Sequence, residues 1–96
     1  MPHYVILASW TEEGIRNVKN APKRAEAFRK AVDAAGGKVL LELHTMGPHD
    51  LVTALELPSD EAMNLLALRF GSQGFVRTTT LKGWTPTEFA QLVQNI

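Results

Sequence analysis

Cysteine is absent from this 96-residue chain, and its absence excludes disulfides, thiolate-bound metals, iron–sulfur clusters and cysteine nucleophiles. The chain also lacks net charge, because ten basic residues balance ten acidic ones. It therefore has no strong positive field of the kind that accompanies nucleic-acid binding. Its N-terminal apolar run is too short to cross a bilayer and has no basic region before it. We expect a cytoplasmic protein without nucleic-acid or membrane partners.

The motifs of several enzyme classes are missing as well. There is no glycine-rich loop of the Walker or dinucleotide-binding type and no Gly-x-Ser-x-Gly elbow, so nucleotide hydrolysis and serine hydrolysis are disfavoured. No cofactor is identified by the sequence. A basic cluster is present, but such clusters are more often solvated helix faces than anion sites. It consists of Arg16, Lys19, Lys23, Arg24, Arg29 and Lys30.

Length and composition predict one compact domain over residues 1–96. The chain is 45% hydrophobic and too short for a second core. A domain of this size buries only a modest share of its surface, and joining sheets between subunits would hide more apolar area. We therefore expect a homodimer or a higher homo-oligomer.

The pattern of apolar residues predicts four strands. The first is short, apolar and partly β-branched, as in a central strand buried on both faces. The second alternates, with Val39, Leu41 and Leu43 on an apolar face and the residues between them on a mixed face. A short turn joins the second and third strands into an antiparallel hairpin. The predicted strands cover residues 4–8, 39–44, 51–57 and 75–81.

Start and stop signals predict the helices between these strands. Thr11 can cap a short helix. A longer helix begins after Asn20, carries an apolar stripe and ends at Gly36-Gly37. A third begins within residues 58–61 and ends at Gly71. The chain therefore alternates strands with helices along most of its length.

A capping box marks the start of a terminal helix. Thr85 and Glu88 have the required spacing, and Pro86 occupies the first helical position. The helix that follows has an apolar stripe, which must dock on another surface. The stripe consists of Phe89, Leu92, Val93 and Ile96.

The order β-α-β-β-α-β followed by a helix predicts the ferredoxin-like α+β fold with a four-stranded antiparallel sheet. In this fold both main helices cover one face of the sheet. The other face is left open, and its mixed composition suggests that it meets a second subunit or encloses a ligand.

With these elements assigned, the chain resembles the GYD-domain family, small bacterial and archaeal proteins placed among the dimeric α/β-barrel folds. The resemblance covers nearly the whole chain and implies the ferredoxin-like fold and a dimer. It implies no activity, because fold alone does not carry function. The matching segments are Ser9-Trp10-Thr11, Gly14, Pro22-Lys23-Arg24-Ala25, Gly36-Gly37, Pro58-Ser59-Asp60-Glu61 and Val76-Arg77-Thr78.

The motif that gives the family its name, Gly-x-Tyr-Asp, stands here as Gly47-Pro48-His49-Asp50. A role that needs a phenol is not implied at His49, although an imidazole can still hydrogen-bond or exchange protons. Asp50 can bond neighbouring backbone N–H groups and fix the hairpin. The alternative is that Asp50 lies at the rim of a pocket and orients His49.

His44 and His49 are the candidate catalytic residues. Glu42 lies on the same strand face as His44, and Asp50 follows His49. Imidazoles beside a carboxylate could transfer protons or bind a divalent metal. The spacing matches no metal motif, so no metal is assigned. A solvated histidine in a turn is the alternative interpretation.

A ligand site is predicted around two aromatic residues. Alternation puts Tyr4 and Trp10 on one side of the first strand, so they are expected to line the same cavity, where such rings hold planar ligands. A place in the core or an interface is the alternative. Arg77 could bind a carboxylate or pair across the sheet with Glu42 or Glu56. The predicted ligand-binding residues are Tyr4, Trp10, Glu42, Asp50 and Arg77.

Three functions remain open at this point. The first is the binding of a small organic molecule in a cavity formed by the open sheet faces of a homodimer. The second is a cofactor-free oxygenase or isomerase that uses His44 or His49 as its base. The third is a structural or regulatory interaction protein that engages a partner through the terminal helix and the basic face of the first long helix.

Overall fold

The computed structural model describes residues 1–96 as one sheet with helices packed on it. The strands are β1 (His3–Trp10), β2 (Lys38–His44), β3 (Leu51–Glu56) and β4 (Val76–Gly83). The helices are α1 (Glu12–Arg16), the 3-10 helix η1 (Val18–Asn20), α2 (Ala21–Ala34), α3 (Asp60–Gly71) and α4 (Pro86–Val93). The order along the chain is the predicted one, and the ferredoxin-like α+β fold is confirmed.

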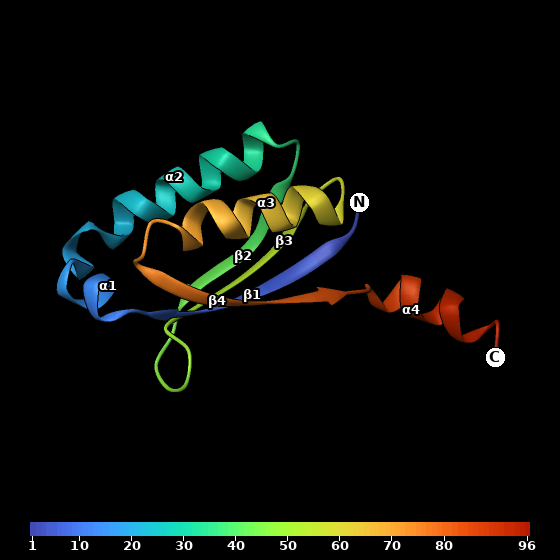
Figure 1. Cartoon of the computed structure of the whole chain (residues 1–96). Helices are drawn as coiled ribbons and strands as arrows, with labels where there is room; N and C mark the ends of the chain where they lie inside the picture. Colours follow the sequence, from blue (N-terminus) through green and yellow to red (C-terminus); the bar gives the residue numbers. More distant parts are fainter.

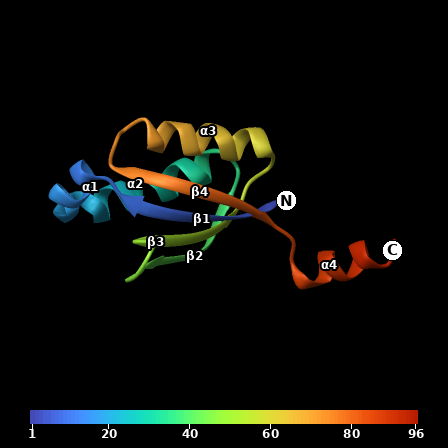
Figure 2. The ribbon, with the colours of Figure 1, turned by 60° about the horizontal axis from the view of Figure 1, so that its bottom comes forward.

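The sheet has the strand order β2-β3-β1-β4, and every neighbouring pair is antiparallel. Helices α2 and α3 lie side by side on one face of this sheet (Figure 1). The turned view shows no helix over the opposite face (Figure 2). None of the helices combines the length and hydropathy that a membrane crossing requires.

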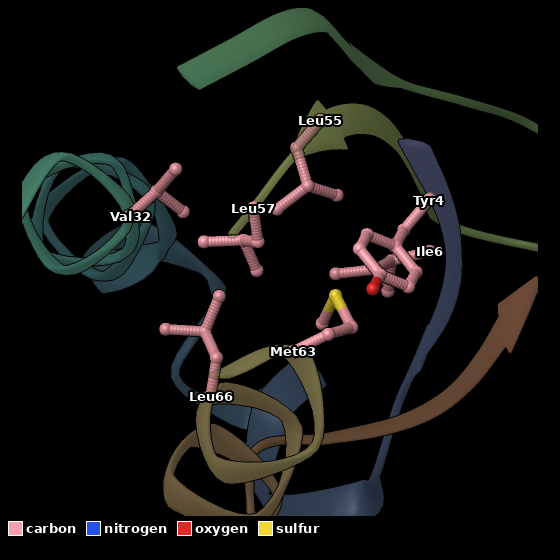
Figure 3. Packing of buried hydrophobic residues seen from close by; sticks show 7 residues of the cluster. All are labelled: Tyr4, Ile6, Val32, Leu55, Leu57, Met63 and Leu66. Atoms are coloured by element: carbon pink, nitrogen blue, oxygen red, sulfur yellow. The ribbon is translucent and has the colours of Figure 1, made fainter. Parts of the chain in front are cut away.

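The hydrophobic core lies between α2, α3 and the covered face of the sheet (Figure 3). Strands β1 and β3 run through the centre of the sheet, and alternate side chains of both strands point into this core. Leu55 and Leu57 are fully buried there. The whole cluster consists of Tyr4, Ile6, Val32, Leu55, Leu57, Met63 and Leu66.

A β-bulge between Val39 and Leu41 corrects the predicted alternation of β2. Val39 packs against the core, whereas Leu41 and Leu43 pair with residues of the open face and are half exposed. The extra residue shifts the side-chain period by one position. As a result, the polar side chains of Glu42 and His44 lie on the same side of the sheet as the helices.

Helix α4 projects away from the sheet (Figure 1), and its Glu88 Oε1 lies 3.8 Å from Nδ1 of His3 in β1. Its predicted capping box is present, with Thr85 Oγ1 accepting from Glu88 N at 3.2 Å and Glu88 Oε1 accepting from Thr85 N at 2.8 Å. Its apolar stripe is exposed, and 59% of the Phe89 surface is accessible to solvent. The stripe therefore stays available to dock on another surface.

Gly14 allows α1 to pack directly on the loop between α3 and β4. Thr11 N donates to Phe75 O at 3.1 Å, and a Cβ added at Gly14 would lie 2.0 Å from that same oxygen. No side chain fits at this distance. The close approach fixes the segment after Trp10 against Phe75, and both of these residues line the pocket described below.

We predict that Gly14→Ala destabilises the fold, by about 1–3 kcal/mol or more, because its methyl group would clash with a backbone carbonyl that cannot swing aside. Gly71→Ala is the matched control, since a Cβ there meets no atom within 4 Å. The control should be neutral or slightly stabilising, because alanine favours helix more than glycine does. Urea unfolding followed by circular dichroism would measure both. Equal stability of the two variants would contradict the steric argument.

Candidate functional site

A pocket of about 80 Å³ lies between α2, α3 and one end of the sheet. Twelve of its eighteen lining residues are hydrophobic. The sheet end is the one where β1 and β2 finish and β3 and β4 begin, because Trp10 pairs with Val76 and His44 pairs with Leu51. An apolar concavity with a few polar groups is the usual form of a small-molecule site, although this one is smaller than most.

Aromatic rings and one guanidinium group meet in this pocket. The Trp10 and His44 rings are stacked, with centroids 6.4 Å apart and planes 18° apart. The guanidinium carbon of Arg24 lies 4.3 Å from the centroid of the Phe75 ring and 5.8 Å from that of the Trp10 ring. Cation–π attraction therefore helps to hold the Arg24 side chain between two aromatic faces.

Glu42 supplies the pocket's one carboxylate. Its Oε1 accepts from Arg29 Nη1 of α2, and only 16% of its side chain is exposed. The ion pair joins α2 to the edge strand β2. Because Arg29 already compensates the charge of Glu42, Arg24 is the pocket's uncompensated cation.

The structure brings together three of the residues that the sequence singled out, because Trp10, Glu42 and His44 all line this pocket. Tyr4 does not, so the expectation that it shares a cavity with Trp10 is wrong. The two residues do lie on the same face of β1, but they are six positions apart, which is roughly 20 Å along a strand. Tyr4 is instead buried in the core.

Arg77 lies on the opposite face of the sheet from the pocket. It pairs in register with Ser9, one position before Trp10, and adjacent strand residues point to opposite faces. The suggested ion pairs between Arg77 and Glu42 or Glu56 are absent. Strand β4 is one edge of the sheet and β2 is the other, so Arg77 and Glu42 are also separated by the width of the sheet.

Asp50 has the structural role that its position in the turn suggested. Its Oδ2 accepts from Trp10 N at 2.9 Å, while its own N–H donates to Ala8 O at 2.8 Å. These bonds tie the loop between β2 and β3 to the end of β1. Asp50 thereby fixes the backbone of Trp10 without lining the pocket itself.

The two histidines are separated by the fold. His44 lines the pocket, and His49 does not. His49 lies in the loop, where its backbone oxygen accepts a hydrogen bond from Thr45 Oγ1 at 2.6 Å. No three histidine, aspartate or glutamate side chains gather closely enough to hold a metal ion. A catalytic role for either histidine stays a prediction, and only His44 lies where it could meet a ligand in this pocket.

Arg24 is the residue that sequence reasoning missed, because it was counted with the basic cluster. Half of that cluster is paired with carboxylates: Arg16 with Glu12 and Glu13, Arg29 with Glu42, and Lys30 with Glu26. Only the pocket distinguishes Arg24 from these neighbours. The one sequence feature that set Arg24 apart was its place in the Pro22-Lys23-Arg24-Ala25 segment, which carries part of the family resemblance.

Comparison with known proteins agrees with this architecture. The family model of the GYD domain matches residues 4–93. The chain belongs to the GYD-domain family. A relative from Thermus thermophilus, named glutamine synthetase and cystathionine beta-lyase binding protein, is 25% identical over 83 residues. That match covers 85% of this chain and 87% of the relative.

A solved structure shows the same fold as this GYD-domain protein. The crystal structure of the Thermus thermophilus protein TTHA0845 matches with a TM-score of 0.55 at 21% sequence identity. The match covers 88% of this chain and 95% of that one. At this level of identity the likeness concerns the fold alone.

Tyr4 forms a partly buried contact with Asp60 at the far end of the core from the pocket. Its hydroxyl donates to Asp60 Oδ1 at 2.5 Å, and Lys82 Nζ lies 2.9 Å from the same oxygen. Burial, followed by the bond to Asp60, raises the pKa of Tyr4 to about 12. The hydrogen bonds from Tyr4 and Lys82 lower the pKa of Asp60. The cluster pins the start of α3 to the sheet.

We predict that stability falls with pH from about 10 to about 12, because the unfolded chain loses the Tyr4 proton near pH 10 while the folded protein keeps it until about 12. Tyr4 is the chain's one tyrosine, so Tyr4→Phe should flatten this part of the curve. Urea unfolding at a series of pH values would measure it. Parallel curves for the two proteins would refute the assignment.

Proposed function

We propose that this GYD-domain protein is a binding module for a small organic molecule, held in the pocket between α2, α3 and the end of the sheet. The observation that carries the proposal is the composition of that pocket. Its wall is apolar, and its polar groups are confined to a few side chains, chiefly Arg24, Glu42 and His44. This combination gives a ligand apolar area to bury and polar groups to fix its orientation.

The proposed site differs from the one expected at first, which was a cavity between the open sheet faces of two subunits. The pocket opens on the helix side because the bulge in β2 turns Glu42 and His44 toward the helices. The volume of about 80 Å³ is small beside the roughly 300–1,000 Å³ of most ligand pockets, so the ligand is small.

A substitution that fills the pocket tests this proposal. Ala25 lines the pocket from α2, whereas Ala27 is exposed on the same helix and lies outside the lining. We predict that Ala25→Phe abolishes the thermal stabilisation that small organic compounds confer on the wild type, while Ala27→Phe preserves it. A ligand at 100 times its dissociation constant stabilises a protein by about 2.7 kcal/mol, which a thermal-shift screen detects easily.

Native mass spectrometry of freshly purified protein gives a second readout, because a retained small molecule would appear as added mass. Compounds that stabilise the wild type and Ala25→Phe equally would show that they bind elsewhere. That result would overturn the proposed site.

We further propose that the open sheet face joins two copies of the chain. The face carries a continuous set of partly exposed apolar side chains, and patches of this kind on soluble proteins commonly mark interaction surfaces. A second copy offers the same surface and can cover it symmetrically. The apolar set consists of Val5, Leu7, Leu41, Leu43, Val52, Ala54 and Leu81.

We predict that Leu43→Glu converts the dimer to a monomer, because it would bury a carboxylate against an apolar face. Leu65→Glu is the matched control, since Leu65 is a comparably exposed leucine on α3. Sedimentation equilibrium would distinguish the 10.6 kDa chain from a species of twice that mass. A wild type that sediments as a monomer at micromolar concentration would refute the proposed interface.

A second candidate function is the binding of another protein through α4. Two observations favour it: the apolar stripe of α4 is exposed, and the Thermus relative is named for binding two enzymes. On this proposal Phe89 and Leu92 contact the partner, as in other amphipathic helices that dock in apolar grooves. The two functions are compatible, because α4 and the pocket lie at opposite ends of β4.

A further inference from the structure

Arg24 has an unsatisfied hydrogen-bonding group inside the pocket region. Its Nη1 donates to Asn17 O at 3.2 Å, whereas its Nη2 is shielded from solvent and has no hydrogen-bond partner. A guanidinium group carries five N–H donors in a planar fork, so most of its donor capacity at this position is unused. Buried donors without partners are rare and costly in folded proteins. An arrangement of this kind indicates a missing acceptor.

No acidic residue of the chain is paired with Arg24. Glu42 is the one carboxylate that lines the pocket, and it is paired with Arg29. The remaining charge near Arg24 therefore favours an anion. The guanidinium carbon lies 4.3 Å from the centroid of the Phe75 ring and 5.8 Å from that of the Trp10 ring, so the cation is held among the aromatic side chains of the pocket.

We infer that the pocket binds a small monocarboxylic acid, with its carboxylate hydrogen-bonded to the Arg24 guanidinium and its apolar body against the side chains of the sheet and helices. This inference rests on the proposed function and adds the chemical class of the ligand. A single hydrogen bond, from Nη1 to Asn17 O, joins the guanidinium to the rest of the chain, so binding the ligand through Nη2 requires the side chain to turn Nη2 toward the pocket. A carboxylate also suits the planar geometry of the guanidinium.

The apolar lining sets the rest of the ligand's chemistry. Phe28, Leu66 and Phe70 contribute the helix-side wall, and Ile6 and Ala8 contribute the wall formed by β1. A second charge on the ligand would lie against this surface without a partner, which is unfavourable. The volume of about 80 Å³ limits the body to a short aliphatic chain or a single ring. Polyanions and phosphates need more donors than the pocket provides.

Nuclear magnetic resonance titration with acids and their uncharged amides tests the inference. The probes are butyrate and benzoate, each compared with butyramide and benzamide. We expect the acids to shift the indole N–H resonance of Trp10 and to bind about 10- to 100-fold more tightly than the amides, the range for a hydrogen bond to a charged group. The indole resonance of Trp84, an exposed residue outside the pocket, is the internal control.

Variants of Arg24 identify the anchoring group. Arg24→Met keeps an apolar stem but removes the charge, and it should erase the preference for acids over amides. Arg24→Lys keeps the charge without the fork and should retain part of that preference. Lys23→Gln is the matched control, because Lys23 is an exposed neighbour outside the pocket and its replacement changes the net charge equally. Thermal unfolding by circular dichroism would verify that each variant is folded.

Three outcomes would overturn the inference, each in a recognisable way. If amides bind as tightly as acids, or if a folded Arg24→Met keeps the preference for acids, the carboxylate assignment fails while the pocket itself stands. If Lys23→Gln weakens acid binding as much as Arg24→Met does, the acids are attracted by the overall positive charge of the region and not by Arg24 itself. If neither acids nor amides shift Trp10, and the compound screen also finds no ligand that Ala25→Phe excludes, the proposed function fails together with the inference.

Discussion

The packing of α2 and α3 onto a single face of the sheet is the interaction on which the rest of this structure depends. Two helices suffice to bury the alternate side chains of the central strands, and Leu55 and Leu57 become fully inaccessible beneath them. They leave the opposite face uncovered, with an apolar surface that no element of the chain reaches. The same packing also creates the pocket, because at one end of the sheet the helices and strands do not close completely on each other.

Small local features hold the pocket end of the fold in place. Gly14 brings α1 into contact with the carbonyl of Phe75, and the carboxylate of Asp50 accepts from the backbone N–H of Trp10. Both Trp10 and Phe75 then flank the Arg24 guanidinium. The Asp of the family motif is thus accounted for as a backbone anchor. His49, which replaces the motif's tyrosine, lies in the same loop but outside the pocket.

The order of elements was readable from the sequence because each strand and helix carries its own local signal. The capping box at Thr85, the alternation in β3 and the paired glycines after α2 depend on neighbours in the chain and need no tertiary information. The candidate site was only partly readable. Trp10, Glu42 and His44 were identified and do line one pocket, but Tyr4 and Arg77 do not.

These differences have specific physical causes. Tyr4 shares a strand face with Trp10 but lies too far along the strand to share its pocket, a distance that alternation alone does not reveal. Arg77 was associated with Glu42 although the strand order puts them on opposite edges of the sheet. The bulge in β2 puts Leu41 and Leu43 on the open face. The bulge is a feature of the pairing between β2 and β3, so the residue pattern of β2 alone does not predict it.

The sequence by itself therefore determined the elements, their order and the fold, because local propensity and periodicity are properties of neighbouring residues. It also determined that the chain has neither thiol chemistry nor net charge. Only the tertiary structure decided which side chains meet. Arg24 looks like one of six basic residues along a helical segment, and it becomes distinct only where Trp10 and Phe75, from distant parts of the chain, enclose its guanidinium.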